Sequence, residues 1–209
     1  MEWTFDEVIT TEFELREILG HPEELVKRKT IDYIDENCRA FIEKSPFITI
    51  ATSDDAGRLD VSPKGDPAGF VKILNSQTLA IPDRPGNRKA DTFTNIIKNP
   101  NIGLLFIIPG IRETLRVNGT AKIVRDAHVL ELLECQGKRP TFAIIVSVKE
   151  AFMHCAKCMI RSKLWAPAEE LEKPTLPSLG KVLVDHSKVE ISYEELDVKI
   201  SNDEVTNLY

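Results

Sequence analysis

The sequence lacks any long apolar run, and this absence limits where the protein can work. No stretch of its 209 residues approaches the roughly 20 consecutive apolar residues of a membrane-spanning helix. The opening residues, MEWTFDEVITTEFE, are acidic and lack the basic start of a secretory signal peptide. We therefore expect a cytoplasmic protein that does not bind a membrane.

Cysteine is also scarce. The four cysteines, Cys38, Cys135, Cys155 and Cys158, are too unevenly spaced for the disulfide framework of a secreted domain. The last two form a Cys-x-x-Cys pair after His154, which could be half of a zinc site or a redox pair. A structural zinc would need a further ligand from a distant cysteine or histidine, and there is no second Cys-x-x-Cys. We therefore expect no metal.

A surplus of positive charge is missing as well. The formal net charge of −6 at pH 7 argues against a general nucleic-acid-binding protein. The charge is uneven, however, with nine Lys or Arg and five Asp or Glu between residues 58 and 116. From residue 168 to residue 209 there are ten acids and four bases. The middle of the chain is therefore a basic region suited to a small anionic ligand.

Within this basic region, two adjacent cations stand at the start of a predicted amphipathic helix. A Pro- and Gly-rich turn leads to Arg88 and Lys89, and Asn99-Pro100 ends the helix. Its predicted apolar face comprises Ala90, Phe93, Ile96 and Ile97. Two cations beside the positive end of a helix dipole are unfavourable unless an anion is bound. The pattern therefore favours a phosphate-binding pocket over two solvated charges.

Short segments of alternating polarity predict a mainly β fold with peripheral helices. The expected strands cover residues 47–53, 58–64, 70–74, 78–81, 102–108, 114–124 and 141–153. Most connections are too short for parallel crossovers, so we expect an antiparallel, closed or split β-barrel. One helix is expected within residues 1–20, and another follows Arg88-Lys89 and ends at residue 98. The other expected helices cover residues 22–44, 126–137, 178–186 and 193–198.

The block PDRPGNRKADTFTNIIKNPNIGLLF, residues 82–106, resembles the flavin mononucleotide (FMN) signature of the pyridoxamine 5′-phosphate oxidase-like proteins. In that family a strand, a Gly-Ser/Asn-Arg-Lys turn, a helix ending in Asn-Pro and an apolar strand follow in this order. The resemblance covers residues 45–167 and implies an antiparallel, Greek-key-like split β-barrel that binds FMN at a homodimer interface. Residues 1–44 would then be a helical segment packed on the barrel, and residues 168–209 an acidic extension.

The resemblance implies a phosphate pocket in which Arg88 and Lys89 hold the FMN phosphate through charge-assisted hydrogen bonds. Asn87 and the exposed backbone near Ile81 and Pro82 would line the same pocket.

The strand 58–64 and the residue after it are implied to run along the flavin ring. The implied residues are Ser62, Pro63, Lys64 and Gly65, of which Gly65 would permit close approach of the ring. Ser62 stands where relatives often have arginine. A β-bulge with an incidental lysine is the alternative.

Two later segments are implied to complete the flavin site. Thr114 matches a polar position that faces the flavin, and Arg116 lies on its face of the strand. The segment HCAKCMIRSKLW resembles the end of the barrel in a subgroup of these proteins. It implies contacts with the far side of the flavin ring, and either the same subunit or the partner subunit could provide them. The implied residues are His154, Lys157, Arg161, Ser162 and Trp165. Trp165 as dimer core is an equal alternative.

The function implied is that of an FMN-dependent oxidoreductase acting on a small-molecule substrate or electron donor, with the flavin carrying the redox chemistry. True pyridoxamine phosphate oxidation is disfavoured because an acidic extension replaces the family's arginine-containing substrate segment. A flavin-binding carrier or sensor without turnover is one alternative, and a barrel that binds deazaflavin or haem is another. No catalytic residue is assigned.

Overall fold

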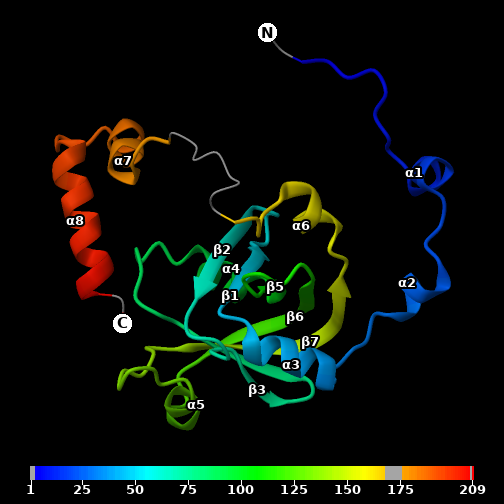
Figure 1. The fold of residues 1–209 in the computed structure, drawn as a ribbon, viewed down its shortest axis with the longest axis horizontal. Coiled ribbons are helices and arrows are strands. Elements are labelled where there is room, and N and C mark those ends of the chain that lie inside the picture. The colour runs from blue at the N-terminus through cyan, green and yellow to red at the C-terminus, as the bar shows by residue number, and fades with distance from the viewer. Residues whose placement is uncertain (1–2, 168–175, 208) are drawn as a thin grey trace.

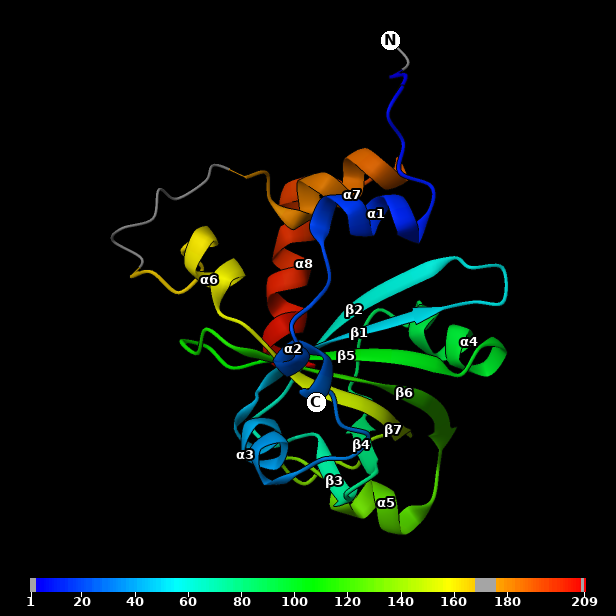
Figure 2. The same cartoon turned by 90° about the vertical axis from the view of Figure 1, so that its right-hand side faces the viewer.

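The computed structural model describes residues 3–167, 176–207 and 209. Its centre is a seven-stranded antiparallel sheet with the strand order β2-β1-β5-β6-β7-β4-β3 (Figures 1 and 2). The strands are β1 (Phe47–Ser53), β2 (Leu59–Gly65), β3 (Lys72–Asn75), β4 (Thr78–Pro82), β5 (Asn101–Ile107), β6 (Thr114–Val124) and β7 (Ala143–His154). The predicted mainly β, split-barrel fold is confirmed.

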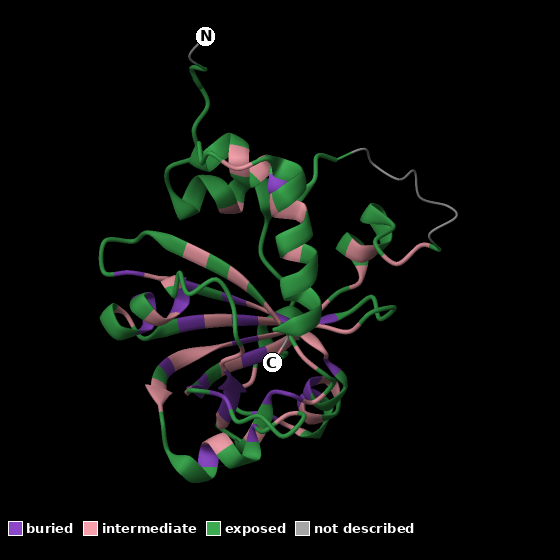
Figure 3. Cartoon of the chain, turned by 90° about the vertical axis from the view of Figure 1, so that its left-hand side faces the viewer, coloured by how far each residue is buried: buried purple, intermediate pink, exposed green. Residues whose placement is uncertain are grey.

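Alternation along β1, β5 and β6 builds much of the core. On β1, Ile48 and Ile50 point inward and are fully buried, whereas Ala51 on the opposite face is exposed. The same alternation on β5 and β6 buries Leu104 and Val117, and the inward residues of six strands join one cluster with α3 and α4. Buried residues are accordingly concentrated in the strands (Figure 3). The sheet therefore has a closed inner face and a partly exposed outer face.

Eight helices are described. They are α1 (Glu12–Leu19), α2 (Glu24–Arg28), α3 (Glu36–Lys44), α4 (Asp91–Lys98), α5 (Ala127–Leu132), α6 (Lys157–Ser162), α7 (Leu179–Ser187) and α8 (Tyr193–Thr206). None of them is both long and apolar enough to cross a bilayer. Compared with the prediction, α5 ends earlier, before Gly137, and α8 continues well beyond residue 198.

The single helix predicted over residues 22–44 is wrong, because the chain forms α2 and α3 with a break between them. In the break, the backbone of Ile31 pairs with Ala151 of β7 through hydrogen bonds of 3.0 and 2.7 Å. Backbone groups used in this way cannot also form helical hydrogen bonds. Asp35 then starts α3 as its N-cap, accepting a hydrogen bond from the backbone N–H of Cys38 at 2.8 Å.

The first helices differ in how they meet the barrel. Cys38 and Ile42 of α3 are part of the main core, whereas α1 and α2 bury no residue and extend away from the barrel (Figure 1). At the other end of the chain, α7 and α8 pack against each other as a hairpin that stands beside the barrel (Figure 1).

Candidate functional site

A cleft of about 1020 Å³ opens beside the start of α4. Its walls come from β2, from the turn over residues 83–90, from the first turn of α4, from residues 138–142 before β7, and from the end of α8. Segments far apart in the sequence therefore meet at one place, at the edge of the barrel where β4 ends.

The turn before α4 leaves backbone N–H groups at the start of the helix without hydrogen-bond partners among the described residues. Asn87 accepts a hydrogen bond at its side-chain oxygen from the N–H of Lys89 at 3.0 Å. Arg88 and Ala90 both have φ of 61°, in the left-handed region that costs an L-residue about 1 kcal/mol or more. No side chain caps α4, whose first helical bond runs from the N–H of Thr94 to the carbonyl of Ala90. The N–H groups of residues 90–93 have no hydrogen-bond partner among the described residues and are thus available to an anion.

The two cations of the turn, Arg88 and Lys89, differ in whether they form an ion pair. Lys89 is exposed and its ammonium lies 2.6 Å from a carboxylate oxygen of Asp91, which raises the pKa of Lys89. Arg88 lies in the same cleft, and within the described residues it has no carboxylate at ion-pair distance. Arg88 is therefore the cation most able to bind a ligand.

On the opposite wall, β2 presents one face to the cleft. Asp60, Ser62 and Lys64 line it, as expected for residues at alternate positions of a strand. Thr92 of α4 donates from its hydroxyl to Asp60 at 2.6 Å and lies 3.1 Å from the hydroxyl of Ser62. This network fixes the first turn of α4 against β2.

The predicted apolar face of α4 is wrong in part. Ile97 is 78% exposed, whereas Thr92 and Asn95 are buried. The side-chain amide of Asn95 donates to the hydroxyl of Thr52 on β1 at 3.1 Å. Because these polar side chains find partners on the sheet, the helix turns them inward instead of Ile97.

Lys64 is a further cation of the cleft without a carboxylate at ion-pair distance among the described residues. Its ammonium lies 5.5 Å from the centre of the Phe93 ring. Burial raises the pKa of the nearby Asp83, and the positive charges of Lys64 and Arg84 partly oppose that rise. The middle of the cleft is therefore cationic but partly apolar.

Five of the residues predicted to bind the cofactor line this cleft together: Ser62, Lys64, Asn87, Arg88 and Lys89. Pro63 and Gly65 lie at the intervening positions of β2, on its other face. Ile81 and Pro82 are buried in β4, directly before Asp83, which does line the cleft.

The other predicted residues gather at the far end of β7. Thr114 of β6 pairs with His154, while Pro82 pairs with Ala143 at the end of β7 next to the cleft. Arg116 donates to Glu150 at 2.8 Å and stacks over the ring of Phe152 at 4.1 Å.

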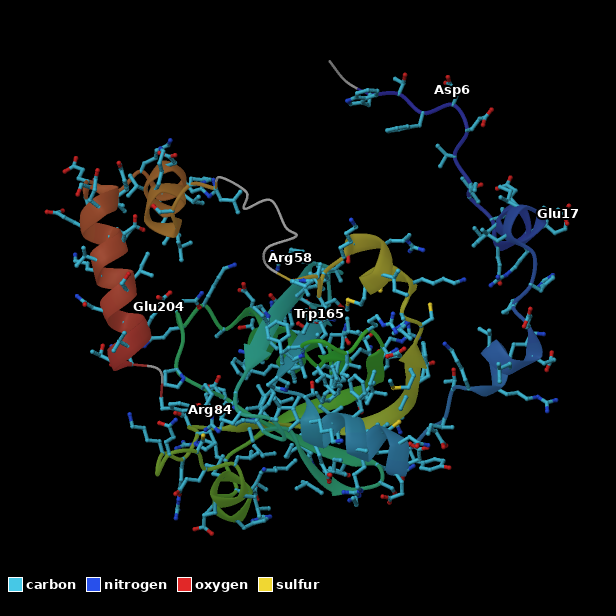
Figure 4. All side chains as sticks on the ribbon, in the orientation of Figure 1. Asp6, Glu17, Arg58, Arg84, Trp165 and Glu204 are labelled. Atoms are coloured by element: carbon cyan, nitrogen blue, oxygen red, sulfur yellow. The ribbon has the colours of Figure 1, made fainter. Side chains whose placement is uncertain are left out.

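His154 and the residues after it surround this second group. Burial lowers the pKa of His154, and the charges of Arg116 and Lys29 lower it further. Trp165, labelled in Figure 4, donates its indole N–H to the carbonyl of Ile111 at 2.8 Å. The predicted residues of α6 are exposed: Lys157, Arg161 and Ser162. None of these side chains lines the cleft of its own chain.

Sequence reasoning missed the outer wall of the cleft. Lys138, Arg139, Asp203, Asn207 and Tyr209 all line it, although they follow Arg88 by 50 residues or more. The one sequence signal for this wall is charge: the acidic C-terminal part is complementary to the basic region and could have been predicted to lie against it. Within the described residues, no group of three or more His, Cys, Asp or Glu side chains is placed to hold a metal ion.

Three solved structures are similar to part of the chain. HupZ from Group A Streptococcus aligns with a TM-score of 0.48 and 20% identity over 57% of this chain and 93% of that chain. An FMN-binding protein from Syntrophomonas wolfei aligns with a TM-score of 0.42 and 12% identity, over 56% of this chain and 88% of its own. An FAD binding protein from Mycobacterium smegmatis aligns with a TM-score of 0.42 and 16% identity, over 59% of this chain and 97% of its own.

No curated protein matches the sequence. The family model described as pyridoxamine 5′-phosphate oxidase matches residues 34–155, from the break before α3 to the residue after β7. This match confirms the resemblance found in residues 82–106 and covers more than half of the chain. The protein is therefore a member of the pyridoxamine 5′-phosphate oxidase family.

Proposed function

We propose that this protein is an FMN-dependent oxidoreductase that works as a cytoplasmic homodimer. The observation that carries the proposal is Arg88, which is held in a left-handed conformation, without an ion-pair partner among the described residues, beside the uncapped start of α4. Strained backbone at such a place is typical of a binding site. The chemical nature of the donors, N–H groups and a guanidinium, fits a phosphate group.

Different residues of the cleft would bind the phosphate and the ring of the cofactor. Arg88, Lys89 and the first N–H groups of α4 would bind the phosphate, and Asn87 would fix the turn that presents them. Lys64 would place a positive charge beside the ring, and Phe93 would shield it from water. When bound, flavin supplies the transfer of electrons to or from a small-molecule substrate or electron donor.

A homodimer explains why the predicted residues fall into two groups. Arg116, Thr114 and His154 lie at the opposite end of β7 from their own cleft, so they can contact a cofactor only in the cleft of a second chain. The cofactor would then lie at the interface and receive residues from both chains.

The outer face of the sheet is suited to be that interface. Strand pairing places one row of outward side chains across five strands: Pro63, Thr49, Leu105, Arg116 and Phe152. Leu59 and Val61, also outward on β2, are 82% and 66% exposed. β2 is an edge strand of the sheet and its inward residues line the cleft, so a second copy that covers the outward face and extends past this edge would lie next to the cleft.

The direct test is the absorbance spectrum of the purified, desalted protein, followed by identification of the chromophore released on denaturation. Oxidised-flavin bands and released FMN are expected. Released deazaflavin or haem, or a colourless protein that fails to bind added FMN, would contradict the cofactor assignment. Oxidation of a nicotinamide cofactor by the loaded protein would separate an enzyme from a flavin carrier or sensor.

A further inference from the structure

The end of α8 forms the outer wall of the cleft. Asp203 of α8, the C-cap Asn207 and Tyr209 line it together with the turn that carries Arg88. Figure 4 shows the end of α8, where Glu204 is labelled, on the same side of the barrel as Arg84. The α7–α8 hairpin itself is held by internal contacts, such as the hydrogen bond from the N–H of Gly180 to Asp197 at 2.8 Å.

One residue joins this hairpin to the barrel. The phenol of Tyr209 donates to Asp66 at 2.6 Å, and Arg84 donates to the other carboxylate oxygen of Asp66, also at 2.6 Å. Lys138 donates from its ammonium to the backbone oxygen of Tyr209. Among the described residues, every hydrogen bond between residues 176–209 and the barrel ends at Tyr209.

The barrel side of this contact is buried, whereas the hairpin has no other hydrogen bond to the barrel among the described residues. The side chain of Asp66 is 2% exposed and that of Arg84 is 16% exposed. Arg84 is fixed further by a hydrogen bond of 2.9 Å to the carbonyl of Leu133. The hydrogen bond to Asp66 also raises the pKa of Tyr209.

We propose that Tyr209, with Asp66 and Arg84, is a latch that holds the end of α8 across the cleft and must release before the bound ligand can leave. The identity of that ligand as FMN rests on the proposed function, but the latch itself does not. Release breaks one hydrogen bond to a carboxylate and one to Lys138, and the α7–α8 hairpin can then move as a unit. Tyr209 is thus a positioning residue that controls exchange of the ligand.

The first test needs no ligand. The thiol of Cys135 lies beside the phenol of Tyr209 and is half-buried, so its alkylation by iodoacetamide reports opening of the latch. Tyr209→Phe removes the hydroxyl and keeps the ring, and it should speed labelling of Cys135 by at least about fivefold, because a hydrogen bond to a charged group is lost. Mass spectrometry resolves each cysteine, with buried Cys38 and exposed Cys155 as internal references.

Tyr193→Phe is the matched control, because Tyr193 begins the same helix without a hydrogen bond to the barrel among the described residues. It should label Cys135 at the wild-type rate. A wild-type rate in Tyr209→Phe as well would overturn the latch.

The second test is the rate at which FMN leaves on dilution, followed by recovery of flavin fluorescence. Tyr209→Phe should release FMN at least about fivefold faster than both wild type and Tyr193→Phe. Faster labelling of Cys135 with an unchanged FMN release rate would show that Tyr209 holds the hairpin but does not control exchange, and would overturn the proposal. If wild type binds no FMN, the proposed function fails while the labelling result still decides the latch.

Discussion

At the scale of single residues, the two neighbouring cations of the turn are not equivalent. Lys89 already shares its charge with Asp91, whereas Arg88 has no such partner among the described residues and is held in a costly backbone conformation. A planar guanidinium can also hold two phosphate oxygens at once, which an ammonium cannot do in the same geometry. Arg88 should therefore contribute most of the side-chain part of phosphate binding.

This difference gives a prediction for FMN affinity. Arg88→Ala should weaken binding by about 30- to 100-fold, equivalent to about 2–3 kcal/mol, because a charge-assisted hydrogen bond to phosphate is lost. Lys89→Ala should weaken it by about threefold, since its charge is exposed and already paired. Titration by flavin fluorescence measures both. Lys98→Ala, at the other end of α4, is the control and should bind as wild type. Equal losses for Arg88 and Lys89 would contradict the assignment.

At the scale of elements, α3 begins where the helix predicted over residues 22–44 is broken. The carboxylate of Asp35 accepts from the N–H of Cys38 and from the side-chain amide of Asn37, and the first of these bonds is the main reason that the pKa of Asp35 lies below 3.8. Since the folded pKa is below the unfolded one, this contribution to stability is complete above about pH 3.8. It is lost as the pH falls through the folded value.

Asp35→Ala should therefore lower the free energy of unfolding by about 1 kcal/mol at pH 7, as for other N-cap residues. The difference from wild type should shrink as the pH is lowered below 3.8. Denaturant unfolding at several pH values measures it. Asp35→Asn, which keeps the cap without the charge, should lose little at pH 7. Because residue 35 titrates only in the wild type, Asp35→Asn should gain on the wild type at low pH by the same amount as Asp35→Ala. A difference between Asp35→Ala and wild type that stays constant down to pH 3 would refute this account of the cap.

The elements also show what the sequence can and cannot predict. Strands such as β1 and β6 were predicted with their observed bounds, because a period of two is a local signal. The break before α3 depends on pairing between Ile31 and Ala151, which lie far apart in the chain. Likewise, the buried face of α4 is decided by Asp60 and Thr52, polar partners on neighbouring strands. Tertiary contacts of this kind override local periodicity.

At the scale of the whole molecule, the candidate site was predicted in part. The turn with Arg88 and Lys89 is contiguous in sequence, so the motif identified it directly. The wall formed by α8 could not be predicted, because nothing local in residues 193–209 indicates docking at Asp66. The placement of Arg116 and His154 away from their own cleft remains consistent with their predicted role only if a second chain supplies them.

The proposed homodimer can therefore be tested by complementation. Arg88→Ala and Arg116→Ala damage opposite sides of the same composite site, and each variant alone should retain little FMN. After unfolding and refolding together, half of the dimers should be mixed, and each mixed dimer has one intact site and one with both defects. FMN content should recover to about a quarter of the wild-type value. Mixing Arg88→Ala with the double variant Arg88→Ala, Lys89→Ala is the control, because every site in every dimer then lacks Arg88, and it should give no recovery.

The start of α4 is proposed to bind the phosphate of FMN. The most direct test compares the affinities for FMN and riboflavin, because riboflavin lacks only that phosphate. Wild type should bind FMN at least about 100-fold more tightly than riboflavin, equivalent to about 3 kcal/mol. In the double variant Arg88→Ala, Lys89→Ala, this ratio should fall toward one, while riboflavin affinity stays unchanged. A ratio that is the same in the wild type and the double variant would show that the phosphate is bound elsewhere.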